Sequence, residues 1–237
     1  MTEIPKATFR NLAVLLIRAG IRLRARNRTV CSAIMMVNRL SKTDLINDVC
    51  NYTLATACLT VAVKQMEENH IGIRDVINSV HRVLHPDEKM MEIGEQFWGI
   101  RYGIARMEFI VLRFLSFDIQ FEDPFVPLAL YLDALRSWLP REFQEKQVIE
   151  SCNAVMRDCF TFPRLFEERK VHEIAIAVLC FVLRGKDIEL PRTSKPWFQK
   201  LYKSSLSSRR VRKLEKVIAT EVYGLQLEES PEKIKSN

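Results

Sequence analysis

The stretch that most constrains this fold runs from Tyr52 to Val63 and contains only apolar residues, alanines and threonines. Alanine and cysteine at four of its positions keep a helix thin, so neighbouring backbones can approach it closely. Apolar residues surround nearly its whole circumference, which predicts a helix buried inside a helical core. Charges begin at Lys64 and continue with Glu67 and Glu68, where such a helix would emerge.

The remaining sequence is typical of an all-α protein. Apolar residues make up 48% of the chain, and only seven glycines occur, too few for a turn-rich β protein. Apolar residues recur at spacings of three and four, which predicts helices. The predicted helices span 8–23, 29–40, 52–65, 71–84, 96–115, 124–139, 142–160, 171–183, 197–202 and 207–223. No apolar run approaches about 18 residues, so we expect no membrane partner, and the N-terminus has no secretory pattern.

A faint internal repeat indicates two similar halves. Displaced by 120 residues, Leu54 falls on Ile174 and Lys64 falls on Arg184. Each half therefore has a small-residue helix in third place, which predicts two five-helix modules, although chance similarity between apolar helices is an alternative. The predicted parts are a flexible start at 1–7, modules at 8–120 and 121–225, and a disordered tail at 226–237.

Glu108 is the least expected residue of its helix. The segment Met107–Phe117 is apolar except for Glu108, Arg113 and Ser116. A carboxylate inside such a helix is costly unless it is paired or hydrogen-bonded. Either Glu108 forms an internal salt bridge, for example to Lys64, or it lies at an exposed edge and receives donors from a partner. Residue chemistry alone favours the salt bridge.

The charged end of the central helix is not explained by helix stability. Lys64 and Glu68 form an i, i+4 pair in the less favourable order, worth about 0.3 kcal/mol. Glutamates at a helix C-terminus also oppose the helix dipole. These charges therefore favour a functional interpretation.

Signatures of enzymes and metal sites are missing. The sequence has neither a Gly-rich phosphate loop nor a nucleophile elbow. His81 and His85 are four residues apart, but no third ligand is evident, so a surface pair is favoured. The six cysteines lie in apolar segments without a C-x-x-C pair, which predicts reduced, buried thiols in the cytosol or nucleus. We expect no catalytic residues, no cofactor and no metal.

Two basic clusters have alternative interpretations. Arg22–Arg28 could bind phosphates, but the exposed end of the first helix is favoured. Ser204–Lys213 could be a nuclear-import patch or a phosphate site, but a capped helix start is favoured. The net charge of +7 does not establish nucleic-acid binding.

The sequence resembles the cyclin family from about Thr8 to Tyr223. The matching stretches of the first half are FRNLAVLLIRAG, the small-residue helix ending in Lys64, and RMEFIVLRFLSFDI. Four further stretches resemble the cyclin Q subfamily, namely IRDVINSVHRVLHP, FWGIR, VHEIAIAVL and KPWFQ. The resemblance implies an all-α fold of two tandem five-helix cyclin-box modules, in agreement with the repeat.

The resemblance also implies a partner. In cyclins the lysine ending the third helix and the glutamate of the fifth bind a cyclin-dependent kinase. These roles fall on Lys64 and Glu108, with Glu67 and Glu68 beside them. The chain would be a non-catalytic activating subunit, in the nucleus and cytoplasm, that favours the kinase's active conformation. The alternative is a nucleic-acid-binding protein, because transcription factor IIB uses the same tandem fold; nucleic acid is the less favoured partner.

Two departures from the cyclin pattern affect these expectations. Cyclins usually read Lys-x-Glu-Glu, whereas this chain has one more residue between Lys64 and Glu67. If the helix runs on, that residue rotates the register by about 100°, and Gln65 would take the place of the lysine. The Met-Arg-x-x-Leu docking motif is replaced by Thr8–Leu12, with Leu15 where a tryptophan would lie. We therefore do not expect substrate docking at that groove.

Overall fold

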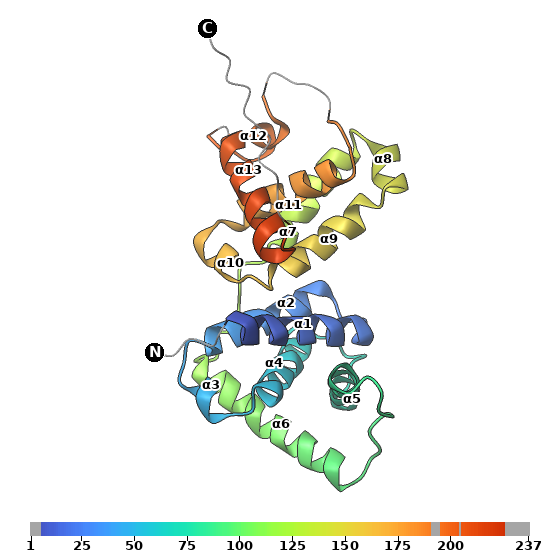
Figure 1. Cartoon of the computed structure of the whole chain (residues 1–237), viewed down its shortest axis with the longest axis vertical. Helices are drawn as coiled ribbons and strands as arrows, with labels where there is room; N and C mark the ends of the chain where they lie inside the picture. The colour runs from blue at the N-terminus through green and yellow to red at the C-terminus, as the bar shows by residue number, and fades with distance from the viewer. Residues whose placement is uncertain (1–5, 191–194, 204, 226–237) are drawn as a thin grey trace. The chain divides into compact units, whose positions relative to one another are not determined.

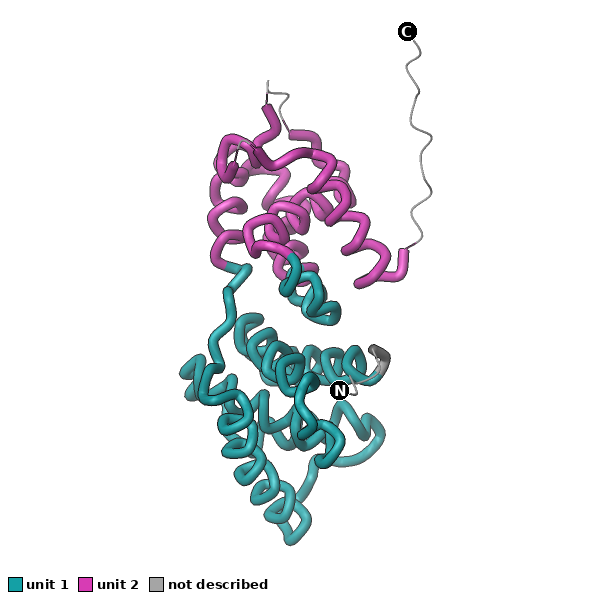
Figure 2. Tube along the Cα trace, turned by 90° about the vertical axis from the view of Figure 1, so that its left-hand side faces the viewer, with its two compact units in different colours: residues 1–125, 156–168 teal, residues 126–155, 169–237 magenta. Residues whose placement is uncertain are grey.

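The computed structural model describes residues 6–190, 195–203 and 205–225, which form helices and loops without a β-strand (Figure 1). It divides into two compact units (Figure 2). Unit 1 comprises residues up to 125 together with 156–168, and unit 2 comprises 126–155 and the residues from 169 onwards. Residues 156–168 thus pack with unit 1, although they follow the predicted module boundary at 120. The predicted disordered tail and residues 1–5 of the predicted flexible start lie outside the described residues, whereas Lys6 begins the first helix.

Unit 1 is built around one buried helix. Its helices are α1 (Lys6–Leu23), α2 (Asn27–Leu40), α3 (Leu45–Asp48), α4 (Asn51–Gln65), α5 (Ile73–Leu84), α6 (Glu95–Phe114) and α10 (Arg164–Glu168). Helix α4 contacts α1, α2, α5 and α6, and every residue from Leu54 to Val63 is buried. The small-residue run therefore forms the predicted core helix. The short α3 was not predicted, because its sequence lies in a polar linker.

Unit 2 has a second buried helix. Its elements are α7 (Phe125–Arg136), α8 (Pro140–Glu145), α9 (Val148–Cys159), α11 (Val171–Gly185), α12 (Trp197–Leu201), α13 (Ser208–Val217) and the π-helical turn η1 (Ile218–Val222). The first residue of α7 and the residues of α9 from 156 onwards are assigned to unit 1. Helix α11 is buried along most of its length and packs against α13. The predicted single helix over 142–160 is wrong: Gln147 has a φ of +47°, which a continuous α-helix cannot contain, and separates α8 from α9.

The two buried helices correspond residue for residue. Helices α4 and α11 each have 15 residues, and α11 begins 120 positions after α4. A left-handed residue follows each helix at the same displacement, Glu67 with φ +53° and Asp187 with φ +50°. Both ends have the Schellman pattern, in which the next amide donates back to the last turn, Glu68 to Val63 over 3.1 Å and Ile188 to Leu183 over 2.9 Å. The predicted repeat is therefore real at these helices.

Side-chain caps begin two helices of unit 2. The Asp123 carboxylate accepts the Phe125 amide over 2.9 Å before α7, and the Ser207 hydroxyl accepts the Arg210 amide over 3.2 Å before α13. These oxygens satisfy amides that have no partner inside the helix. Across the described ranges, no helix has both the length and the apolar character to cross a bilayer.

Candidate functional site

The candidate site begins with an ion pair between α4 and α6. Lys64 lies in the last turn of α4, and its Nζ is 2.5 Å from Oε2 of Glu108. The lysine side chain is 65% exposed and the glutamate side chain 13%. Packing of α4 against α6 brings these residues together from positions far apart in the sequence. The salt bridge proposed from the sequence is therefore present, and it lies at a partly exposed edge.

The extra residue after Lys64 does not rotate the lysine away. Helix α4 ends at Gln65, and Glu67 then adopts the left-handed conformation, so the helical register stops before the additional residue has an effect. Gln65 faces inward instead: its Oε1 accepts the Ser32 hydroxyl over 2.8 Å, and its Nε2 donates to the Ile119 carbonyl over 3.1 Å. Lys64 thus keeps the position beside Glu108.

Glu68 has a different environment from the one expected. Its residue exposure is 2%, whereas the preceding Glu67 is exposed. The Glu68 carboxylate accepts the Arg26 amide over 3.0 Å and the Thr29 hydroxyl, so it holds the N-terminal end of α2. A carboxylate is favourable at the positive end of a helix dipole. Glu68 therefore does not share the exposed surface of Lys64 and Glu108, but ties the turn after α4 to α2.

Aromatic side chains cover the exposed side of α6, which the sequence analysis did not identify. Trp98, Tyr102 and Phe109 are 51%, 61% and 74% exposed. Their spacings of four and seven place them within about 40° of one another around the helix. Arg101 lies 4.9 Å from the Trp98 ring centre, and Arg106 lies 4.5 Å from that of Tyr102. We call these three rings the aromatic face of α6.

Glu108 flanks the aromatic face of α6, because it immediately precedes Phe109 in the helix. Large exposed apolar side chains that gather on one surface mark interaction sites. Tyrosine and tryptophan are also enriched at protein interfaces, because their rings are apolar while their O–H or N–H group can contact water. The site thus combines an ion pair with a strip of exposed rings.

The histidine pair does not form a metal centre. The His81 and His85 rings are 4.9 Å apart, and both approach Glu88, at 3.2 Å and 3.5 Å. Within the part of the chain that the structure describes, no three His, Cys, Asp or Glu residues are arranged to hold a metal ion.

The cysteines are not all buried as expected. Cys31, Cys58, Cys152 and Cys159 are buried thiols, and burial raises the pKa of Cys152 to about 12. Cys50 is exposed, because it precedes the buried part of α4 as the N-cap residue. Backbone hydrogen bonding to Thr53 lowers the pKa of Cys50.

Known proteins resemble this chain in sequence and in fold. No family model matches. Mouse cyclin-L2 is 27% identical over 153 residues, which are 61% of this chain and 27% of that protein. Chicken cyclin-L1 is also 27% identical over 153 residues, covering 61% of this chain and 26% of that protein. The chain therefore spans about a quarter of the length of these relatives.

A solved structure shows the same fold. The chain is similar to a chain of the yeast RNA Pol II CTD kinase CTDK-1 complex, with a TM-score of 0.61 and 15% identity. The match covers 91% of this chain and 65% of that one, slightly under two thirds of its length. The chain is thus similar to cyclins in sequence, and it shares its fold with a chain of this kinase complex.

Proposed function

We propose that the chain is a regulatory subunit that binds a cyclin-dependent serine/threonine kinase and stabilises its active conformation. The single observation that supports this proposal most is the aromatic face of α6, which lies beside the ion pair of Lys64 with Glu108. The similarity to cyclins, and to a chain of a kinase complex, supports a kinase as the partner for this surface. Chemistry would then belong to the kinase.

The ion pair retains capacity for a partner. An ammonium group has three donors, and a carboxylate has about four acceptor positions. Lys64 uses one N–H on Glu108, and its side chain remains mostly exposed. The Glu108 side chain is mostly covered, so the exposed lysine is the side of the pair that a partner reaches first. The pair is therefore suited to receive backbone groups of a kinase on both its donor and its acceptor.

The aromatic face of α6 would supply most of the binding energy. Buried aromatic anchors dominate protein interfaces, and polar groups at their edge exclude water and set the orientation. Trp98, Tyr102 and Phe109 fit the first role, while Lys64 and Glu108 fit the second. Binding that favours the active kinase conformation over the inactive one would shift the kinase population towards activity.

The solved neighbour gives the proposal a cellular setting. It is a chain of the yeast RNA Pol II CTD kinase CTDK-1 complex. We therefore favour a kinase linked to transcription and a nuclear location. Nucleic-acid binding is not favoured, because the similarities in sequence and fold are to cyclins and to a chain of a kinase complex.

The proposal is tested by co-precipitation of kinases with the wild-type chain and with Glu108→Ala, followed by a kinase assay. Glu108→Ala is expected to weaken kinase binding by about 30-fold, as for truncation of one partner in an interfacial charge pair. Glu215→Ala is the matched control, because Glu215 forms a similar ion pair with Arg184 in unit 2, at 3.0 Å.

A second variant addresses the aromatic face of α6. Phe109→Ala removes a side chain that is mostly exposed, so folding should be unaffected, whereas kinase binding should weaken by about tenfold. Unchanged binding and kinase activity for both Glu108→Ala and Phe109→Ala would remove this surface from the interface.

A further inference from the structure

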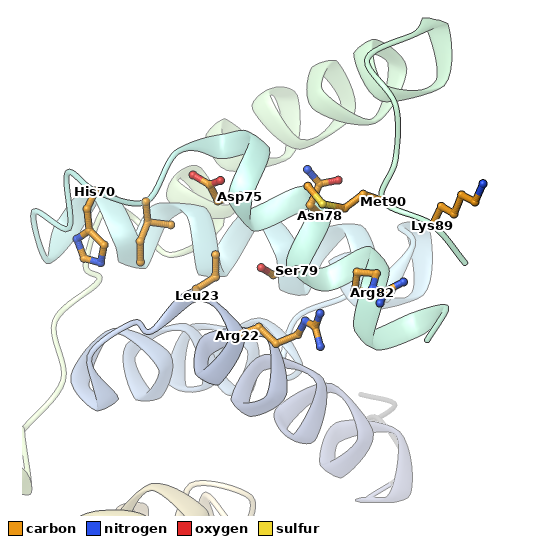
Figure 3. A pocket seen from close by; sticks show the side chains of 10 residues that line it. Arg22, Leu23, His70, Asp75, Asn78, Ser79, Arg82, Lys89 and Met90 are labelled. Carbon is orange, nitrogen blue, oxygen red and sulfur yellow. The ribbon is translucent and has the colours of Figure 1, made fainter. Parts of the chain in front are cut away.

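A basic cleft lies between the C-terminal end of α1 and α5 in unit 1 (Figure 3). Its volume is about 640 Å³. The polar or charged side chains that matter for its chemistry are those of Arg22, His70, Asp75, Ser79, Arg82 and Lys89. Neither Lys64 nor Glu108 lines it. We call it the basic cleft.

Helix packing directs these side chains into one space. Helix α5 packs against α1, and Arg22 belongs to the last turn of α1. Asp75, Ser79 and Arg82 are spaced by four and three residues, so they occupy one face of α5. Figure 3 shows the Arg22 side chain entering from α1 and the Arg82 side chain from α5, with Ser79 between the two helices.

The basic cleft has an excess of positive charge, because two arginines and a lysine line it together with a single carboxylate, that of Asp75. Among the described residues, no salt bridge joins Arg22, Arg82 or Lys89 to a carboxylate. Some other arginines of unit 1 do meet a carboxylate, for example Arg28, which lies 2.6 Å from Asp123. Arg82 donates to the Glu88 carbonyl, which fixes its guanidinium without neutralising it.

The acidic groups nearby are engaged elsewhere. Asp75 accepts the Gly72 amide over 2.9 Å at the start of α5, about 10 Å along the helix axis from Arg82. The Glu88 carboxylate contacts His81 at 3.2 Å. The Arg82 end of the basic cleft is thus left with the guanidinium groups of Arg22 and Arg82 and the Ser79 hydroxyl, while Lys89 lies at its rim with its side chain directed outward (Figure 3).

We propose that the basic cleft binds a phosphate monoester, carried by a phosphorylated serine or threonine of a peptide. A guanidinium presents a planar fork of donors that matches phosphate, and Lys89 at the rim adds a point charge. A phosphoryl group carries a charge of about −1.5 to −2 and three acceptor oxygens, which suits two guanidinium groups and the Ser79 hydroxyl better than a carboxylate does.

This site would add a docking role to the regulatory one. It rests on the proposed function only for the source of the peptide: a substrate already phosphorylated once would be held near the kinase for a further round. Retention of that kind raises the effective concentration of the remaining sites. Binding of the phosphate itself requires no kinase, so the two proposals can fail separately.

The test uses the full-length chain and a fluorescent peptide with a single phosphoserine, measured by fluorescence anisotropy. Peptides with serine or glutamate at that position, and inorganic phosphate as a competitor, are measured alongside. The phosphopeptide is expected to bind at least about tenfold more tightly than either other peptide, because hydrogen bonds to charged groups are worth about 1.5 to 3 kcal/mol. Arg22→Gln and Arg82→Gln should each weaken it by about tenfold or more.

The chain offers a matched control. Arg74→Gln removes the same charge from an exposed position of α5 that does not line the basic cleft, and should leave affinity within about twofold. Arg22 is also exposed, so Arg22→Gln tests the site without risk to folding. Glu108→Ala should leave phosphopeptide binding unchanged, which separates this site from the kinase surface.

Four outcomes would overturn the proposal. Absence of phosphopeptide binding removes the site. Equal affinity for the glutamate peptide shows carboxylate recognition instead. Equal weakening by Arg74→Gln shows that only the net charge matters. Inorganic phosphate that binds as tightly as the peptide assigns the basic cleft to a free anion.

Discussion

Each unit contains an ion pair between the end of its buried helix and a later helix, but the surfaces around the two pairs differ. Lys64 at the end of α4 meets Glu108 on α6, and Arg184 at the end of α11 meets Glu215 on α13. The Arg184 side chain is 64% exposed and the Glu215 side chain 9%, almost as in unit 1. The cations occupy matching positions of helices with the same length. The fold therefore produces this arrangement twice.

The surroundings of the two glutamates differ. Helix α6 exposes aromatic rings, whereas α13 exposes cations at Arg209, Arg212 and Lys213. The ion pair alone is thus not evidence for a binding site, because it recurs in unit 2 beside a helix whose exposed side chains are mostly cationic. What distinguishes unit 1 is the aromatic face of α6, and a partner should be sought there.

The largest effect on stability is expected at Glu68, the residue just after the left-handed one, where the two units have different kinds of side chain. Unit 1 has the buried carboxylate of Glu68 at this position, and unit 2 has the buried side chain of Ile188. Glu68→Ile gives unit 1 the residue of unit 2 and removes the acceptor of the Arg26 amide and the Thr29 hydroxyl. We expect a loss of about 3 kcal/mol in the free energy of unfolding, measured by urea denaturation.

An exposed neighbour provides the control for that substitution. Glu67→Ala lies one residue earlier and should change stability far less. Wild-type stability in Glu68→Ile would mean that the N-terminal end of α2 needs no partner.

A smaller effect should appear at the left-handed residues themselves. An L-residue in this conformation is strained by about 1 to 2 kcal/mol, although glycine loses more entropy on folding. Glu67→Gly should therefore stabilise the protein and raise Tm by about 2 °C in thermal unfolding. Asp187→Gly should have a smaller effect, because aspartate tolerates this conformation better. Lower Tm values for both variants would contradict the shared helix ending.

The smallest effect concerns the pH dependence of unit 2. Burial raises the pKa of Glu215 above its ordinary value of 4.5, and the charges of Arg184 and Arg212 oppose this rise. The folded state thus holds the proton more tightly than the unfolded state does, so stability falls as the pH rises from 4.5 through the raised pKa. Glu215→Gln should remove this fall, as measured by urea midpoints across the range. Parallel curves for wild type and variant would show that the pKa is not raised.

Periodic and local features were predictable from the sequence. The run of small and apolar residues after Tyr52 predicted the buried helix α4, and the internal repeat of 120 residues predicted its match with α11. Both patterns lie in residues that are neighbours in the sequence, so they can be recognised without the fold. Ser207 was identified as a cap for the same reason. The pairing of Lys64 with Glu108 was proposed because an apolar helix rarely carries a lone carboxylate.

Features that depend on distant contacts were not predictable. Glu68 was expected on the surface, but it is buried. Its hydrogen-bond partner Arg26 lies 42 residues away in the sequence, so no local pattern indicates the contact. The break at Gln147 has no local signal, since glutamine shows no preference for a positive φ. The aromatic face of α6 was missed because exposed and buried aromatic residues look alike in a helix that is apolar all round.

The left-handed conformation of Glu67, just after the end of α4, affects where related sequences can gain or lose residues. A left-handed residue resets the chain direction, so residues added after it leave Lys64 where it is. Added residues before Lys64 would turn it away from Glu108 by about 100° each. Insertions and deletions are therefore tolerated on one side of this lysine and excluded on the other. A sequence alignment that fixes the number of residues between the lysine and the two glutamates would therefore place the wrong residue of this chain at the lysine position.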